Sequence, residues 1–102
     1  MKILYHPAVR KFLRQESKEV KAAATHFTEL LAELGHTLSM PYAKPVGSGL
    51  WELRLRGRHS YRILYGFQGG EALLLHAFKK STQALRREDI ELARKRLDGY
   101  RI

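Results

Sequence analysis

The sequence contains no cysteine, only three prolines and no long apolar run. Without cysteine the chain forms no disulfide, no cysteine-ligated zinc site and no thiol redox motif. No apolar stretch approaches the ~18 residues that span a bilayer, and the few apolar residues before Pro7 do not make a secretory signal. We therefore expect a soluble, cytoplasmic protein that does not engage a membrane.

The five histidines, which have no metal-ligand spacing, do not predict a metal site. Gly47-Ser48-Gly49 lacks the lysine and the following helix that a phosphate-binding loop needs. The sequence thus predicts neither a metal nor a cofactor.

Acidic residues are scarce beside basic ones, with ten Asp and Glu against 19 Lys and Arg. The net charge is +9 and the isoelectric point is about 10.2. A chain of 102 residues has the size of a single domain, expected to cover residues 1–102, and can bury roughly two-thirds of its unfolded surface. The excess of positive charge indicates a polyanionic partner such as nucleic acid, the ribosome or an acidic protein.

The first third of the chain is predicted to form a strand and two helices. Residues 2–5 are typical of a short strand, and Pro7 suits the first turn of a helix over about 7–15. Ser17 is expected to cap a second helix, whose apolar residues recur every three or four positions until Gly35 ends it. The two helices are expected to pack one apolar stripe against a sheet.

The remainder of the chain predicts a meander and a final helix. Residues 36–49 hold two prolines and two glycines and are expected to form a loop. Three strands are then predicted, joined in part by a hairpin turn at Gln68-Gly69-Gly70, over 50–56, 61–67 and 72–78. The last helix is expected over about 86–99, with an apolar stripe of Ile90, Ala93, Leu97 and Tyr100.

This order of elements indicates an α+β fold. The N-terminal strand and the helical hairpin are expected to pack on one side of a twisted antiparallel sheet, and a C-terminal helix completes the domain. The other side of the sheet would then remain uncovered.

The uncovered side is expected to be strongly basic. Between Leu53 and Gly70 there are four arginines and no acidic residue: Arg54, Arg56, Arg58 and Arg62. Because side chains alternate along a strand, Arg54, Arg56 and Arg62 are expected to share the face opposite the apolar residues, with Lys79 and Lys80 at its rim. Such a surface suits a single-stranded nucleic-acid backbone, although charged side chains are also simply tolerated on a solvated outer face.

The stretch from Pro41 to Tyr65, PYAKPVGSGLWELRLRGRHSYRILY, resembles the RelE/ParE-type toxins of bacterial toxin–antitoxin systems. The segments 76–82 and 86–96 are also similar, most of all to the HigB-like, phage-associated branch. The resemblance implies a RelE-like fold and a toxin that enters the ribosomal A site. There the 2′-hydroxyl of the mRNA attacks the neighbouring phosphate, which makes the toxin an endoribonuclease. It also implies a cognate antitoxin, of the helix-turn-helix HigA-like type, through which alone the complex binds operator DNA.

The same resemblance implies roles for particular residues. Arg62 matches an arginine that contacts the scissile phosphate, and Lys80 matches a basic group on the leaving side, with Lys79 as its neighbour. His59 is a further acid–base candidate because imidazole titrates near neutral pH. The expected RNA-binding residues are Arg54, Arg56, Arg58, Trp51, Arg86 and Arg87.

Two aromatic side chains also have plain structural interpretations. Trp51 is more often an anchor of the sheet than a platform for a base. His76 lies among apolar residues of its strand and is expected to be packed or hydrogen-bonded within the fold.

Two other functions remain open for this sequence. A ParE-type toxin inhibits gyrase on the same fold without nuclease activity. A non-toxic domain that binds nucleic acid or a protein partner would share the basic surface as well.

Overall fold

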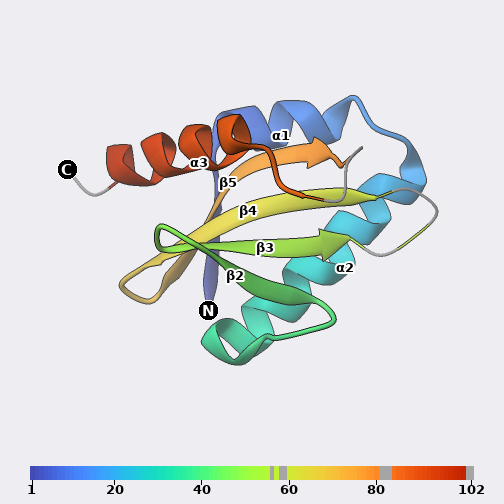
Figure 1. The fold of residues 1–102 in the computed structure, drawn as a ribbon. Coiled ribbons are helices and arrows are strands. Elements are labelled where there is room, and N and C mark those ends of the chain that lie inside the picture. The colour runs from blue at the N-terminus through green and yellow to red at the C-terminus, as the bar shows by residue number, and fades with distance from the viewer. Residues whose placement is uncertain (56, 58–59, 81–83, 101–102) are drawn as a thin grey trace.

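The computed structural model, which describes residues 1–55, 57, 60–80 and 84–100, shows one five-stranded sheet with helices on both faces (Figure 1). This arrangement confirms the predicted α+β class. In chain order the elements are β1 (Lys2–Tyr5), α1 (Pro7–Arg14), α2 (Lys18–Leu34), the short 3-10 helix η1 (Gly35–Thr37), β2 (Ala43–Gly47), β3 (Leu50–Leu55), β4 (Tyr61–Gln68), β5 (Glu71–Lys79) and α3 (Arg87–Tyr100).

The predicted boundaries of the first two helices are confirmed by their caps. Pro7 occupies the first turn of α1, and the Nδ1 atom of His6 accepts a hydrogen bond from the Ala8 backbone N–H at 3.0 Å. The Ser17 hydroxyl accepts from the Val20 backbone N–H at 3.2 Å, at the start of α2. Gly35 ends α2 with a φ of 54°, a left-handed conformation that favours glycine.

The strands follow the order β1-β5-β4-β3-β2. All neighbours are antiparallel except β1, which lies parallel to β5 at one edge. The sheet is therefore mixed rather than wholly antiparallel, because β1 adds to the antiparallel meander as a parallel edge strand beside β5. The predicted turn between β4 and β5 is confirmed, and Gly69 supplies its positive φ of 59°.

A bulge interrupts the pairing of β4 with β5. Leu64 pairs with His76 and Tyr65 pairs with Leu74, so that Leu75 is an extra residue on β5. Bulges leave ladder groups unpaired, and here the Leu75 carbonyl accepts a hydrogen bond of 2.8 Å from Nη1 of Arg96 on α3. The bulge is thus fixed by the helix that packs over it.

One predicted loop is a strand in the structure. Residues 36–49 were expected to be irregular because of their prolines, yet Ala43–Gly47 forms β2 and pairs with β3. Pro45 lacks a backbone N–H, which excludes it from the middle of a sheet but not from an edge. Because β2 is the outermost strand, one side of it needs no partner.

The helices cover both faces of the sheet, which corrects the expectation that they all lie on one side. In Figure 1, α2 passes behind β3 and β4 while α3 lies in front of the sheet. The core under α1 and α2 includes Val9, Phe27, Leu31, Leu53, Ile63 and Tyr65. The core under α3 consists of Leu50, Leu64, Leu73, Leu75, Ala93 and Leu97.

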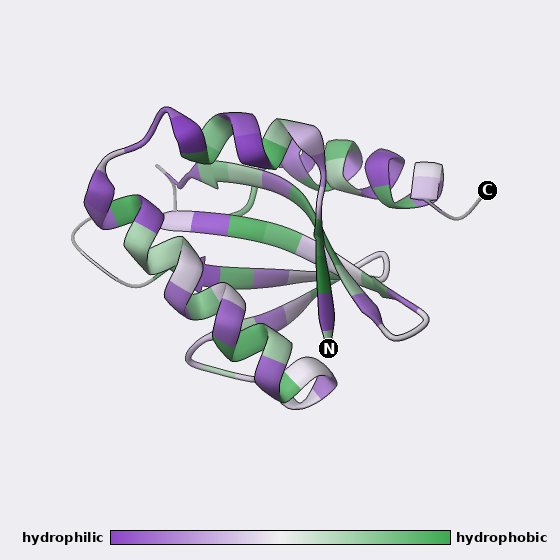
Figure 2. Cartoon of the chain, turned by 180° about the vertical axis from the view of Figure 1, so that it is seen from behind, coloured by the Kyte–Doolittle hydropathy of each residue, from purple (hydrophilic) through white to green (hydrophobic). Residues whose placement is uncertain are grey.

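The hydropathy of the strands explains this second layer. The middle strands are green over much of their length in Figure 2, whereas α1 and α2 alternate between polar and apolar residues. Leu73, Leu74 and Leu75 are all buried although neighbouring side chains point to opposite faces. A strand that is apolar on both faces needs cover on both, and α3 provides the second cover.

Glycine at position 66 lets α3 approach the sheet closely. A Cβ atom there would meet the two methyl carbons of Leu97 at 3.1 and 3.2 Å. Leu97 itself is fully buried. The absence of a side chain at Gly66 therefore lets Leu97 and α3 pack close to the backbone of β4.

The stability of the fold should depend on the protonation of His6. Burial, and secondarily the Arg96 guanidinium, lowers the pKa of His6. The unfolded chain then binds a proton at a higher pH than the native one, so the free energy of unfolding should fall as the pH decreases from 7 to 5. Urea denaturation of the parent and of His6→Asn, which keeps a capping acceptor, should show a flatter pH dependence for the variant. Equal slopes for the two proteins would contradict this role of His6.

Candidate nucleic-acid interface

Two arginines lie side by side on the α3 face of the sheet. Arg54 on β3 is the direct register partner of Arg62 on β4, and Arg62 in turn is opposite Phe78 on β5. The prediction that Arg54 and Arg62 share a face is confirmed. We call Arg54, Arg62 and Phe78 the arginine row.

Lys80 extends this side of the sheet and Lys79 does not. Lys79 pairs with Tyr61, whose ring belongs to the core under α1 and α2. The Lys80 backbone N–H donates to the Ser60 carbonyl at 2.6 Å, which continues the pairing one residue beyond β5. Because side chains alternate, this register puts the half-buried Lys80 on the face of the arginine row and Lys79 on the opposite face.

A buried carboxylate lies beneath the arginines. Glu52, which is 1% exposed, pairs with Leu64, two residues along β4 from Arg62 and on the same face. Its Oε1 atom is 3.6 Å from Nε of Arg62. Glu52 directly precedes the segment 53–70, which contains no acidic residue. The alternation of β3 would have revealed Glu52, since it places Glu52 and Arg54 on one face.

The burial of Arg62 corrects the expectation of an open basic wall. The residue is only 8% exposed, and its Nη1 atom donates to the Tyr61 carbonyl at 3.0 Å. Burial lowers the pKa of Arg62 and the nearby Arg54 lowers it further, while the Glu52 charge acts in the opposite direction. Arg54 and Lys80 are half-buried, so a ligand reaches them more readily than Arg62.

Trp51 is an anchor of the sheet, as its structural interpretation predicted. It pairs with Tyr65 on the face of α1 and α2, and the two rings stack with centroids 6.4 Å apart. The indole therefore lies on the opposite side of the sheet from the arginine row. This position does not support its predicted contact with RNA at that row.

His76 connects the arginine row to α3. Its Nε2 atom is 2.7 Å from Oδ1 of Asp89 in the first turn of α3, and both side chains are largely buried. Its ring also stacks on Phe78, with centroids 4.9 Å apart. The expected packing and hydrogen bonding of His76 are confirmed, and this contact fixes the start of α3 beside the arginine row.

The remaining predicted residues have other places. Arg87 forms an exposed ion pair with Glu91 at 2.8 Å, one turn along α3. The Arg86 carbonyl accepts from the backbone N–H groups of Asp89 and Ile90 at the start of the same helix. The predicted residues Arg56, Arg58 and His59 lie outside the described residues.

Two further properties concern metals and membranes. Within residues 1–55, 57, 60–80 and 84–100, no three His, Asp or Glu side chains gather in a way that could hold a metal ion. In that same part of the chain, no helix has the length and apolarity required to cross a bilayer.

Comparison with known proteins identifies the family. The family described as phage derived protein Gp49-like (DUF891) matches residues 11–98. The chain belongs to this Gp49-like family. No curated protein matches the sequence significantly.

A solved structure shares the fold. It is a chain of the heterotetrameric YoeB–YefM toxin–antitoxin complex from Staphylococcus aureus, similar with a TM-score of 0.56 and 15% sequence identity. The similarity covers 72% of this chain and 90% of that one. The RelE-like fold predicted for this Gp49-like chain is thus confirmed, whereas its place in the HigB branch remains a prediction.

The pairing of Glu52 with Arg62 should be visible in stability. Glu52→Gln leaves the Arg62 charge buried without its opposing charge, which should cost about 3 kcal/mol or more of the free energy of unfolding. The double variant Glu52→Gln/Arg62→Gln should lose less than the sum of the two single variants. Urea denaturation of all four proteins gives the coupling energy, and additive losses would show that the two side chains act independently.

Proposed function

We propose that this Gp49-like protein is the toxin of a toxin–antitoxin pair and that it cleaves mRNA on the ribosome. The observation that supports it most is the arginine row, in which Arg54 and Arg62 are direct register partners with Lys80 on the same face. The membership of the family and the fold shared with the YoeB–YefM complex agree with a toxin.

The charges of this face favour an anionic ligand. Like charges directly opposite each other in an antiparallel pair repel. Among the described residues, an ion pair joins Glu52 to Arg62 and no ion pair joins a carboxylate to Arg54. Arg54 and Lys80 therefore leave net positive charge where the sheet is partly accessible. A phosphate group is a suitable ligand because the guanidinium fork matches its oxygens.

The chemistry needs no nucleophile from the protein. The 2′-oxygen of the RNA bonds to the adjacent phosphorus, the bond from phosphorus to the 5′-oxygen breaks, and a 2′,3′-cyclic phosphate forms. The 2′-hydroxyl loses a proton and the departing 5′-oxygen gains one. Arg54 and Lys80 would stabilise the charge on the phosphoryl oxygens during this exchange, and Arg62 would reinforce it from its buried position.

Proton transfer must be assigned to other groups than the arginines. An arginine side chain stays protonated at neutral pH in proteins and so cannot serve as a general base. Lys80 lies on the correct face, whereas Lys79 lies on the other and is the weaker candidate. His59 remains a candidate by its chemistry.

The proposed partners follow from the same assignment. The ribosome would present the mRNA, and a cognate antitoxin of helix-turn-helix, HigA-like type would neutralise the toxin and connect it to operator DNA. Coexpression of such an antitoxin should restore growth.

The variant that tests this proposal replaces the two half-buried cations Arg54 and Lys80 and leaves the buried Arg62 unchanged. Arg54→Gln/Lys80→Gln removes two positive charges and keeps the ion pair of the buried Glu52 with Arg62. Arg62→Ala would instead leave the Glu52 carboxylate buried without its partner. If the proposal is correct, induction of the parent in bacteria arrests growth and produces new transcript 5′ ends, and the variant cleaves at least ~100-fold more slowly. The matched control is Lys18→Gln/Lys95→Gln, which removes the same charge at exposed positions of α2 and α3 and should cleave like the parent.

Other outcomes would overturn the nuclease proposal in different ways. A folded Arg54→Gln/Lys80→Gln protein that cleaves as fast as the parent would exclude this site. DNA damage signalling without cleaved transcripts would favour a ParE-type gyrase inhibitor. Growth without any defect would favour a non-toxic binding domain.

A further inference from the structure

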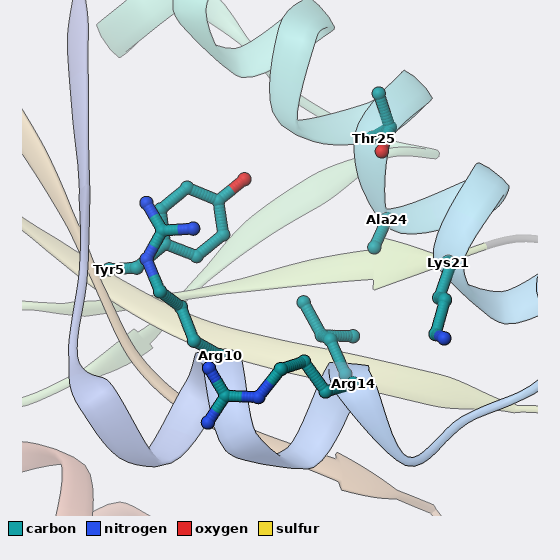
Figure 3. Close-up of a pocket in the computed structure, with 7 residues that line it drawn as sticks. Tyr5, Arg10, Arg14, Lys21, Ala24 and Thr25 are labelled. Carbon is teal, nitrogen blue, oxygen red and sulfur yellow. The ribbon is translucent and has the colours of Figure 1, made fainter.

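A second positively charged site lies on the other face of the sheet. A cavity of about 340 Å³ opens where β1 meets α1 and α2. Arg10 and Arg14 reach it from α1 and Lys21 from α2, as Figure 3 shows. We call this the hairpin pocket.

The hairpin pocket combines cations with an apolar lining. Tyr5, Leu13 and Ala24 contribute to its walls and also pack against the core under α1 and α2. The three cationic side chains are exposed at its rim. The pocket can therefore accept an apolar group inside and negative charge around it.

The cations of the pocket lack internal compensation. Among the described residues, no carboxylate forms an ion pair with Arg10, Arg14 or Lys21, and no acidic residue lines the cavity. Arg10 and Arg14 are four residues apart on α1, a spacing at which like charges repel. An anionic ligand would relieve this repulsion.

We propose that the hairpin pocket binds an acidic peptide segment of another protein, with an apolar side chain in the cavity and carboxylates on Arg10, Arg14 and Lys21. Charge complementarity supports this class of ligand. The small apolar cavity suits a side chain such as leucine, which buries its surface there.

The geometry favours a peptide over RNA. Proteins that bind single-stranded nucleic acid stack bases on exposed aromatic rings. Tyr5 is the aromatic residue that lines this pocket, and the Arg10 guanidinium already lies over its ring, 4.2 Å from the centroid (Figure 3). A base would have to displace Arg10 to reach that face, whereas a carboxylate can use the guanidinium where it lies.

This site is separate from the arginine row. The row faces α3, while Tyr5, Leu13 and Ala24 belong to the layer of α1 and α2. A peptide in the hairpin pocket would leave Arg54 and Lys80 accessible. The proposal does not depend on nuclease activity, and the binding test below measures it without cleavage.

The test uses a fluorescein-labelled peptide of ten residues that alternates Glu or Asp with Leu. A second peptide carries Gln and Asn in place of the acids. Fluorescence anisotropy should show binding of the acidic peptide, weakened at least tenfold in the Arg14→Gln/Lys21→Gln protein. The Lys44→Gln/Lys95→Gln protein loses the same charge elsewhere and should bind within twofold of the parent.

Amide chemical shifts of the unmutated protein provide an independent measurement. With the acidic peptide, the shifts should change in α1, α2 and the end of β1 rather than in β3 and α3. A single-stranded RNA of ten nucleotides should not displace the peptide at equal concentration.

Three results would overturn the proposal. Equal weakening by both charge variants would mean that binding reflects net charge alone. Displacement of the peptide by RNA, with the same shifts, would make the pocket a phosphate site. Absence of binding by the acidic peptide would exclude a peptide site altogether.

Discussion

Burial of β4 and β5 on both faces is the constraint on which the rest of this structure depends. Leu64, Leu73 and Leu75 point to one side of these strands, and Ile63, Tyr65 and Leu74 to the other. Burying such side chains stabilises the fold by roughly 1.5–3 kcal/mol each relative to leaving them exposed. Helices must therefore cover both faces, and Arg54 and Lys80 lie where the sheet is only partly covered.

The two basic regions are separated by the same constraint. The arginine row lies on the α3 side, next to the contact of His76 with Asp89. The hairpin pocket lies on the side of α1 and α2. Residues of β1, α1 and α2 line it, and three of them are the cations Arg10, Arg14 and Lys21. Each region thus occupies a different solvent-facing part of one small sheet.

Local patterns predicted the elements better than their layers. The helices over Pro7–Arg14 and Lys18–Leu34 were recognisable from apolar spacing and from the capping residues Ser17 and Gly35. The face chosen by α3 was missed, although three consecutive leucines in β5 indicate burial on both sides. The strand β2 was missed because prolines argue against a strand unless it is known to be at an edge, and edge position is a property of the whole sheet.

The candidate site was predictable in its alternation and not in its burial. Placing Arg54 and Arg62 on one face needs only the two-residue period of the strands. Whether Arg62 is open depends on Glu52, on β5 and on α3, which come together only in the folded chain. The assignment of Lys79 and Lys80 depends on register, since a shift of one residue moves a side chain to the other face.

The extra residue Leu75 changes the phase of β5. Up to and including Leu75, the odd-numbered side chains of Leu73 and Leu75 point to the α3 face. After it, the even-numbered side chains of His76 and Phe78 point to that face, followed by Lys80. An uninterrupted ladder would turn His76 away from Asp89 and would present Lys79 beside the arginines instead. Leu75, which lies two strands away from Arg54, therefore determines which side chains of β5 lie beside the arginines. The Arg96 guanidinium holds Leu75 in place through the Leu75 carbonyl.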